Sequence, residues 1–509
     1  METKTAAIEM RNITKRFGPV LANDKVWLNI YRGEILALLG ENGSGKTTLM
    51  NMLSGIYFPD EGEIKIDGKE VVIRSPKDAF DNGIGMIHQH FKLVDVLTAA
   101  ENIVLGLPGK LDLKAASAKI REICDKYGFS VDPTQKIYDM SVSQKQTVEI
   151  VKVLYRGADI LILDEPTAVL TPQETDKLFA VLRNMRNDGK AIVIITHKMH
   201  EVEALSDRVA ILRHGQFIGD MLTKDTNAQE MTNMMVGHAV SLNIERPDPV
   251  DPKPRIEVKG LTVRSVDGII KLDDVSFTAN SGEILGIAGI SGCGQKELLE
   301  AIAGLQTVES GSISYIEDDG SREELVGKDP LSIAELGVSL SFVPEDRLGM
   351  GLVGNMNLAD NMMLRSFRRG KSIFTDRRSP RALAESVVQE LSVSTPSVDT
   401  PVRRLSGGNV QKVLVGREIA SAPTVLLTAY AVRGLDIHSS YTIYDLINRQ
   451  KKAGVAVIFV GEDLDVLLEL CDRILVLCGG KVSGIVPGHG AEKREVGMMM
   501  TKLGGQSHE

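Results

Sequence analysis

Two short segments in the first half of the chain carry residues suited to phosphate chemistry. The first, GENGSGKT from Gly40 to Thr47, has the glycine and lysine spacing of a phosphate-binding loop. An apolar strand precedes it and a helix-forming segment follows, which disfavours the alternative of a simple glycine-rich turn. Lys46 is expected to reach the β and γ phosphates of a nucleotide, and Thr47 to bind Mg²⁺. The predicted ATP-binding residues of this segment are Gly40, Asn42, Gly43, Gly45, Lys46, Thr47 and Thr48.

The second segment, ILILDEPT from Ile160 to Thr167, is an apolar strand that ends in two carboxylates. Phosphoryl transfer depends on positioning and on charge neutralisation more than on covalent chemistry. Asp164 is therefore expected to hold the Mg²⁺ shell, and Glu165 to polarise the attacking water. A solvated acidic turn is the alternative, and the phosphate loop upstream disfavours it.

The elements that must position these residues occur twice. The segment 32–56, RGEILALLGENGSGKTTLMNMLSGI, matches the segment 281–305, SGEILGIAGISGCGQKELLEAIAGL. Further along, MSVSQKQTVEI from Met140 matches LSGGNVQKVLV from Leu405. Such self-similarity indicates a duplicated domain. Each copy reads as a strand, a Gly-rich loop and a helix, then alternating helices and apolar strands, which predicts an α/β domain with a largely parallel sheet.

The length of 509 residues is too great for one core, so two or more domains are expected. The copies join at ERPDPVDPKPRIEV, whose four prolines favour an extended linker. We expect a first domain over 1–244, a linker over 245–258 and a second domain over 259–509. The net charge of −9 argues against affinity for nucleic acid, and no apolar run approaches 18 residues, so any membrane role is expected to come through a partner.

The second copy has lost the residues with phosphate chemistry. Gln295 stands at the position of Lys46, and Lys296 at the position of Thr47. The acid pair has become Ala429 followed by Tyr430. Lys296 is not expected to replace the missing lysine, because one helical residue rotates a side chain by about 100°.

The order of these elements resembles the ATP-binding-cassette (ABC) ATPases, over essentially all 509 residues. The resemblance implies two tandem ABC-type nucleotide-binding domains, each a P-loop α/β core with a helical subdomain, arranged head to tail. It also implies a Mg²⁺- and water-sensing role for Gln89 and a place near the γ-phosphate for His197. Phe17 would stack on adenine, with packing in the core as its alternative. The catalytic residues would be Glu165, His197 and Gln89, and the Mg²⁺ residues Thr47, Gln89 and Asp164.

The signature motif of the family, L-S-G-G-Q, shows the opposite asymmetry. The second copy keeps LSGGN from Leu405 to Asn409, whereas the first has MSVSQ from Met140 to Gln144. Glycine lets a backbone approach a phosphate closely, and a Cβ obstructs that approach. In the ABC family the phosphate loop of one domain faces the signature of the other. The resemblance therefore predicts one working composite site, which takes Ser406, Gly407 and Gly408 from the second domain.

All the losses fall in the other composite site. Hydrolysis there is not expected, while weak nucleotide binding through the remaining N–H groups stays open. The residues of this degenerate second site are Gly289, Gly294, Gln295, Lys296, Tyr430, Glu462, Ser141 and Ser143.

A duplicated ATPase with one degenerate site and no membrane segment resembles the ATPase subunits of bacterial sugar and nucleoside importers. Segments such as GMIHQHFKLVDVLTAAENIVLG and PEDRLGMGLV look like the nucleoside branch. The resemblance implies ATP and Mg²⁺, two transmembrane permease subunits, a substrate-binding lipoprotein reached through the permease, and a peripheral place on the cytoplasmic face of the inner membrane. No nucleic acid partner is expected. The alternative is a soluble, non-transport ABC ATPase that acts on ribosomes or nucleic acid; a regulator that binds ATP without turnover is opposed by Glu165 and His197.

Overall fold

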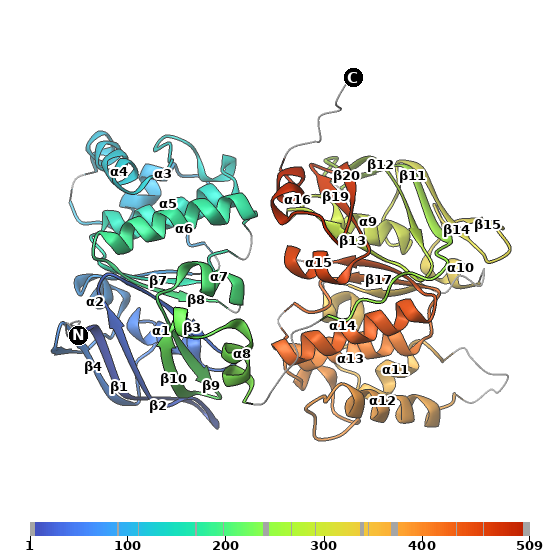
Figure 1. The fold of residues 1–509 in the computed structure, drawn as a ribbon, viewed down its shortest axis with the longest axis horizontal. Coiled ribbons are helices and arrows are strands. Elements are labelled where there is room, and N and C mark those ends of the chain that lie inside the picture. Colours follow the sequence, from blue (N-terminus) through green and yellow to red (C-terminus); the bar gives the residue numbers. More distant parts are fainter. Residues whose placement is uncertain are drawn as a thin grey trace. The chain divides into compact units, whose positions relative to one another are not determined.

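The computed structural model describes residues 6–88, 91–109, 111–167, 170–196, 198–237, 244–265, 267–290, 292–335, 340–344, 346–367, 375–433, 435–461 and 463–501. The chain divides into two compact units, Met1–Ser241 and Leu242–Glu509. Their elements can be followed along the chain in Figure 1.

A six-stranded sheet forms the centre of the first unit. Its strand order is β10(Gln216–Leu222), β9(Arg208–Arg213), β3(Glu34–Leu39), β8(Ala191–Ile195), β7(Ile160–Asp164) and β6(Ile84–Ile87). All neighbours are parallel except β9 and β10, which form an antiparallel pair. Every residue of β3 and β8 is buried, as expected for parallel strands that are covered on both faces.

Alternate residues of the central strands enter two different cores. Leu36 and Leu38 of β3 pack with α1(Lys46–Leu53) and with a smaller antiparallel sheet. Ile35 between them packs on the opposite face with α6(Pro172–Asn187). The smaller sheet has the order β2(Val20–Tyr31), β1(Ala6–Phe17), β4(Glu61–Ile66) and β5(Lys69–Val71).

A helical subdomain lies at one end of the first unit, where Figure 1 shows α3, α4 and α5 together. Its helices are α3(Ala99–Val104), α4(Leu113–Tyr127) and α5(Val142–Tyr155), and they share a small core of their own. Val148 of α5 belongs to that core, whereas Ile150 packs against the large sheet. The helix that follows the first signature segment therefore joins the two parts of the unit. The remaining helices are α2(Pro76–Asp81), α7(Met199–Leu205) and α8(Ala228–Val236).

The second unit repeats this plan strand for strand. Its large sheet has the order β20(Lys481–Pro487), β19(Arg473–Cys478), β13(Ile284–Ala288), β18(Ala456–Val460), β17(Val425–Ala429) and β16(Leu340–Val343). Its small sheet has the order β12(Ile270–Asn280), β11(Pro254–Arg264), β14(Ser310–Ile316) and β15(Arg322–Glu324). Its helices are α9(Gln295–Ile302), α10(Pro330–Glu335), α11(Leu358–Met363), α12(Arg378–Glu390), α13(Gly407–Ala420), α14(Ile437–Lys452), α15(Leu464–Leu470) and α16(Lys493–Met499). The predicted α/β class and the tandem duplication are confirmed.

The segment predicted as a linker, residues 245–258, is bound to the second unit over part of its length. Arg246 donates from Nη1 to the carbonyl of Cys471 at 2.6 Å. The buried amine of Lys451 donates to the carbonyl of Pro247 and to Asp472 Oδ1. Since β11 begins at Pro254, the last residues of the segment are sheet. A buried amine such as that of Lys451 needs hydrogen-bond acceptors. A proline-rich pattern does not predict that Pro247 supplies one of them.

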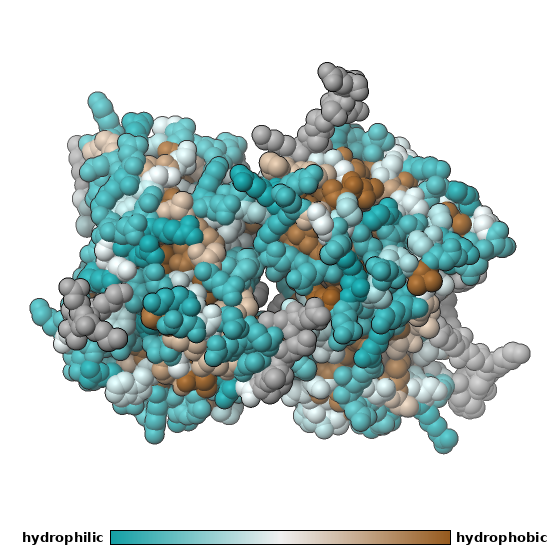
Figure 2. All heavy atoms as spheres, viewed as in Figure 1, coloured by the Kyte–Doolittle hydropathy of each residue, from teal (hydrophilic) through white to brown (hydrophobic). Residues whose placement is uncertain are grey.

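The surface shown in Figure 2 is mostly hydrophilic, with hydrophobic side chains in small separate patches. In the described part of the chain, no helix has the length and apolar character needed to cross a membrane.

Candidate functional site

The phosphate loop of the first unit connects β3 to α1, and the helix begins at Lys46. The Lys46 amine lies across the loop, donating to the carbonyls of Gly40 at 2.7 Å and Glu41 at 2.9 Å. The side chain is almost buried, and this burial lowers the pKa of Lys46 against the attraction of Glu165 and Asp164. The Lys46 amine therefore lies inside the phosphate loop, bound to two of its carbonyls.

The turn into α1 requires glycine. Gly45 has a φ of 94°, a left-handed conformation that side chains rarely adopt. A Cβ on Gly45 would also lie 2.3 Å from the carbonyl oxygen of Ala22. The loop is thus held tightly against the start of β2, which fixes the direction of the first N–H groups of the helix.

The acid pair lies at the end of β7, as predicted: Asp164 is the last residue of the strand, and Glu165 follows it. The Thr47 hydroxyl donates to Asp164 Oδ2 at 3.3 Å, so two of the three residues expected to hold Mg²⁺ are in contact. Burial raises the pKa of Asp164, and the neighbouring charge of Glu165 raises it further. Glu165 itself has a φ of 47°, and its N–H donates to the carbonyl of Ile195 at 2.9 Å. This unusual backbone is stabilised by the adjacent strand, and it directs Glu165 differently from a residue that simply continued β7.

Gln89 and His197 lie outside the described residues. The strands before them, β6 and β8, end at Ile87 and Ile195, and both strands flank β7 in the sheet. Because the carboxyl ends of parallel strands meet at one edge, β6, β7 and β8 end at the edge of the sheet where the phosphate loop follows β3.

Phe17 lies at the end of β1 and is 41% exposed, so it does not pack in the core. Its ring makes an edge-to-face contact with the ring of Tyr57, at 5.1 Å between centroids, and the amine of Lys15 lies 5.6 Å from its centroid. Tyr57, which follows α1, is a candidate that the sequence pattern did not identify. Two exposed aromatic rings side by side provide a surface on which a planar base can stack.

The two signature segments share one backbone design. Ser406 caps α13, and its Oγ accepts from the N–H of Asn409 at 3.4 Å. Ser141 caps α5 in the same way, with Gln144 N–H as donor at 3.3 Å. What differs is the first turn, where α13 has Gly407 and Gly408, and α5 has Val142, an exposed side chain, and Ser143. The first turn of the second signature therefore has no Cβ at two positions where the first signature has one.

The phosphate loop of the second unit keeps its form without its charge. Gln295 is buried, and its Nε2 donates to the carbonyl of Ile290 at 3.1 Å. Lys296 turns to solvent, half exposed, with its amine 3.7 Å from Glu300. The start of α9 again follows a left-handed glycine, Gly294, with a φ of 98°. Lys296, one residue after the position of Lys46, thus points away from the place that the Lys46 side chain occupies in the first unit.

The second unit lacks the acid pair but keeps the backbone conformation found at that position in the first unit. Tyr430 has a φ of 54°, and its N–H donates to the carbonyl of Val460 at 2.9 Å. These are the conformation and the hydrogen bond of Glu165 in the first unit. Glu462, at the position of His197, lies outside the described residues. Among the residues that the structure describes, no group of three or more His, Cys, Asp or Glu side chains could hold a metal ion by itself.

Two P-loop α/β units, each with a helical subdomain whose central helix starts at a serine cap, define the class of the ABC ATPases. A profile of the ABC transporter family matches residues 23–168 and 272–428, more than half of the chain. The chain belongs to the ABC transporter family, and it is an ABC-type ATPase, as the sequence predicts.

Similar proteins extend over the full length of the chain. The nucleoside import ATP-binding protein NupA of Lactococcus lactis subsp. cremoris is 42% identical over 99% of this chain and 99% of its own. The glucose import ATP-binding protein TsgD13 of Haloferax volcanii is 39% identical over 98% of this chain and 96% of its own. The archaeal ribosome recycling factor aABCE1, solved in complex with the ribosomal stalk protein aP1, has a TM-score of 0.60 and 16% identity over 91% of this chain and 87% of that chain. This last likeness shows the fold alone.

Proposed function

We propose that the chain is the ATP-hydrolysing subunit of an ABC importer and that it hydrolyses ATP at one composite site. The observation that carries this proposal is the division of intact motifs between the units. The first unit has Lys46, Thr47 and the acid pair, and the second has the signature turn with both glycines, Gly407 and Gly408. In the ABC family these parts face each other across a head-to-tail pair, so the intact parts would meet in one site and the degenerate parts in the other.

In the working site, each residue acts on a different part of the nucleotide. Lys46 neutralises the β and γ phosphates, and the N–H groups of the first turn of α1 bind their oxygens. Glu165 accepts a hydrogen bond from the attacking water and orients it, with His197 and Gln89 beside the γ-phosphate. Ser406, Gly407 and Gly408 bind that phosphate from the opposite side. Phe17, with Tyr57 beside it, stacks on the adenine.

Mg²⁺ fits the residues of the first unit. A hydroxyl and a carboxylate are ligands that Mg²⁺ prefers, and Thr47 Oγ1 and Asp164 Oδ2 are 3.3 Å apart. The raised pKa of Asp164 supports this assignment, because a buried carboxylate next to a second carboxylate favours a cation beside it. Thr47 and Asp164 would hold the ion, which when bound would neutralise negative charge on the phosphates.

In the second unit we propose a degenerate site that does not hydrolyse ATP. Gln295 cannot neutralise a phosphate, and Tyr430 cannot activate water as a carboxylate does. The fold of this unit is retained because the working site depends on its signature turn. Residues 1–244 and 259–509 would be the two ATPase domains, with 245–258 between them.

The partners would be two transmembrane permease subunits and, through them, an extracytoplasmic substrate-binding lipoprotein. The full-length similarity to import ATP-binding proteins for a nucleoside and for glucose supports import over work on ribosomes or nucleic acid. We favour a nucleoside as cargo, with a simple sugar as the alternative. The chain would be attached peripherally to the cytoplasmic face of the inner membrane through the permease.

The test is ATPase activity of the assembled transporter in lipid vesicles, with binding protein and either a nucleoside or ribose. Stimulation by one cargo class, abolished by Glu165→Gln, is expected. Activity that responds to ribosomes and not to binding protein with cargo would contradict the proposal. In parallel, alkaline carbonate should release the chain from membranes while the permeases remain.

A further inference from the structure

Arg347 connects three segments of the second unit. It begins a short π-helical turn, Arg347–Gly351, which follows β16 in the chain. Its guanidinium donates from Nη1 to the carbonyl of Gly407 at 3.0 Å, and from Nη2 to the carbonyl of Arg433. Gly407 is the first residue of α13, and Arg433 lies in the loop after β17. One side chain therefore ties the signature turn to two loops at the carboxyl edge of the sheet.

The two nitrogens of Arg347 suit this task because the guanidinium is a rigid planar fork. A cation at this position also has an electrostatic cost. It lies at the start of a helix, where negative charge is favoured, and burial together with the charge of Arg433 lowers the pKa of Arg347. Such a position becomes favourable when an anion binds at the helix start.

The signature glycine leaves room for Arg347. A Cβ on Gly407 would lie 3.3 Å from Nη1, tighter than most Cβ contacts. In the first unit, Val142 takes the position of Gly407. The stretch from the end of β6 to Val94, whose N–H binds Asn102, is three residues shorter there than the stretch from the end of β16 to Val353, whose N–H binds Asn361. Arg347 therefore lies in a segment that differs between the two units, beside a glycine that also differs.

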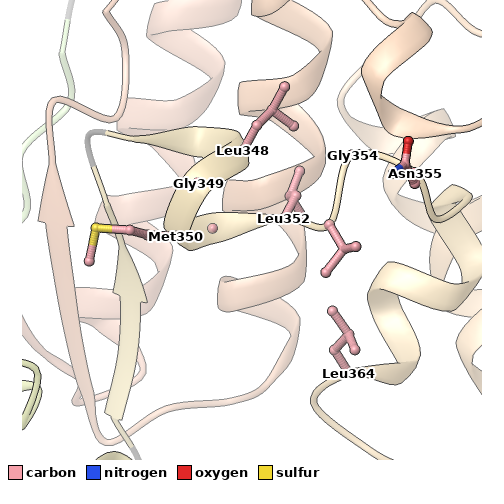
Figure 3. Close-up of a pocket in the computed structure, with 9 residues that line it drawn as sticks. Leu348, Gly349, Met350, Leu352, Gly354, Asn355 and Leu364 are labelled. Atoms are coloured by element: carbon pink, nitrogen blue, oxygen red, sulfur yellow. The ribbon is translucent and has the colours of Figure 1, made fainter.

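The turn that carries Arg347 is fixed to the same helix at its other end. Arg417 of α13 donates from Nη2 to the carbonyl of Gly351 at 2.7 Å. Arg417 in turn pairs with the fully buried Glu418, which also binds Arg365. The middle of the turn lines a pocket of about 360 Å³, whose lining in Figure 3 includes Leu348, Leu352 and Leu364. The turn and α13 are therefore expected to move as one body.

We propose that Arg347 is a positioning residue for ATP hydrolysis. It holds the signature turn and the loop after β17 in the arrangement that receives the terminal phosphate of the ATP bound to the first unit. This inference rests on the composite site proposed above. Because ADP lacks the terminal phosphate, loss of the bridge should weaken the binding of ATP and leave the binding of ADP unchanged.

The experiment measures affinity for ATP and for ADP by calorimetry, in the full-length chain with Glu165→Gln, which prevents turnover. Three variants are compared: Arg347→Ala; Arg347→Lys, which keeps the charge but lacks the planar fork of the guanidinium; and Arg347→Phe with Gly407→Val, which replaces both residues of the bridge by apolar ones. Arg381→Ala is the matched control, since it removes an exposed arginine that pairs with Asp399 in the same unit.

All three variants should bind ATP about tenfold more weakly, the value of about one charge-assisted hydrogen bond, and should bind ADP within about twofold of the parent. The control should change neither affinity. Unchanged ATP affinity in Arg347→Ala, full recovery in Arg347→Lys, or an equal loss of ATP and ADP would each overturn the inference. Gly408→Asp separates the two proposals: if it weakens ATP binding and the Arg347 variants do not, only the inference fails, and if it has no effect either, the composite site fails as well.

Discussion

Gln295 lies in the loop of the second unit as Lys46 lies in the loop of the first. Each side chain turns back to a carbonyl of its own loop, Gln295 to Ile290 at 3.1 Å and Lys46 to Glu41 at 2.9 Å. The amide thus satisfies the loop as the amine does and supplies no charge for a phosphate. Glutamine in place of lysine at this position therefore keeps the hydrogen bond to the loop and removes the positive charge.

Lys46→Ala should therefore abolish ATP turnover, because it removes the cation that the first loop directs at the β and γ phosphates. Lys296→Ala is the control, since that side chain points to solvent and pairs with Glu300. It should keep steady-state ATPase activity of the assembled transporter within about threefold of wild type, the scale of an exposed ion pair. Equal damage by the two substitutions would show that the second loop also works.

Gly408→Asp should reduce turnover from the other unit. It places bulk and negative charge where the N–H groups of α13 would meet the γ-phosphate, and the loss of one preorganised contact of this kind costs about 10²–10³ in rate. Ser143→Asp, at the same position of the first unit, should leave the rate within about threefold. The double variant with Lys46→Ala should be strongly non-additive, because either change disables the same site. Additive losses would mean two separate sites.

Asp164→Asn should stabilise the nucleotide-free chain while it abolishes hydrolysis. The folded-state pKa of Asp164 is raised by burial and by Glu165, so its contribution to stability is fully present below the unfolded pKa and is lost as pH rises through the folded pKa. Ionisation of the buried carboxyl therefore destabilises the first unit, and asparagine cannot ionise. Thermal unfolding of the full-length chain should show a Tm about 2 °C higher for the variant.

The acidic side of the same measurement is the control. As pH falls, the wild-type carboxyl takes up a proton and comes to resemble the amide, so the difference in Tm should shrink. A difference that stays constant with pH, or a less stable variant at neutral pH, would count against a destabilising Asp164 charge.

Phe17→Ala should weaken the binding of ATP and of ADP to the same extent, about tenfold, because both carry the adenine that the ring would stack on. Turnover at saturating ATP should remain near wild type, since the ring is remote from the phosphates in this assignment. Trp27→Ala, which removes another exposed aromatic of the same sheet, is the matched control. Selective loss of ATP binding, with ADP unaffected, would assign Phe17 a different role.

The local patterns of the sequence predicted the elements that carry the chemistry. The phosphate loop lies between β3 and α1, and β7 ends at Asp164, because a buried strand, a glycine turn and a helix start each have a short-range signal. The repeat made the second unit predictable from the first. The direction of the Lys296 side chain, away from the phosphate loop, followed from helix geometry alone.

Other features depend on contacts between segments that are distant along the chain. Tyr57 meets Phe17 only after β1 and the end of α1 come together, and no local pattern marks that pair. Arg347 binds main-chain carbonyls, which a side-chain motif does not record. The composition of the linker likewise does not predict the hydrogen bond from Lys451 to the carbonyl of Pro247.

The most direct test of the one-site account is a count of the ADP formed in a single turnover. The assembled transporter is loaded with ATP and Mg²⁺, unbound nucleotide is removed, and ADP is measured per chain, with Glu165→Gln as the variant that keeps its ATP. We expect one ADP per chain from the wild type and none from the variant. Two ADP per wild-type chain would contradict the account, because the site with Gln295 and Tyr430 would then have to hydrolyse ATP as well.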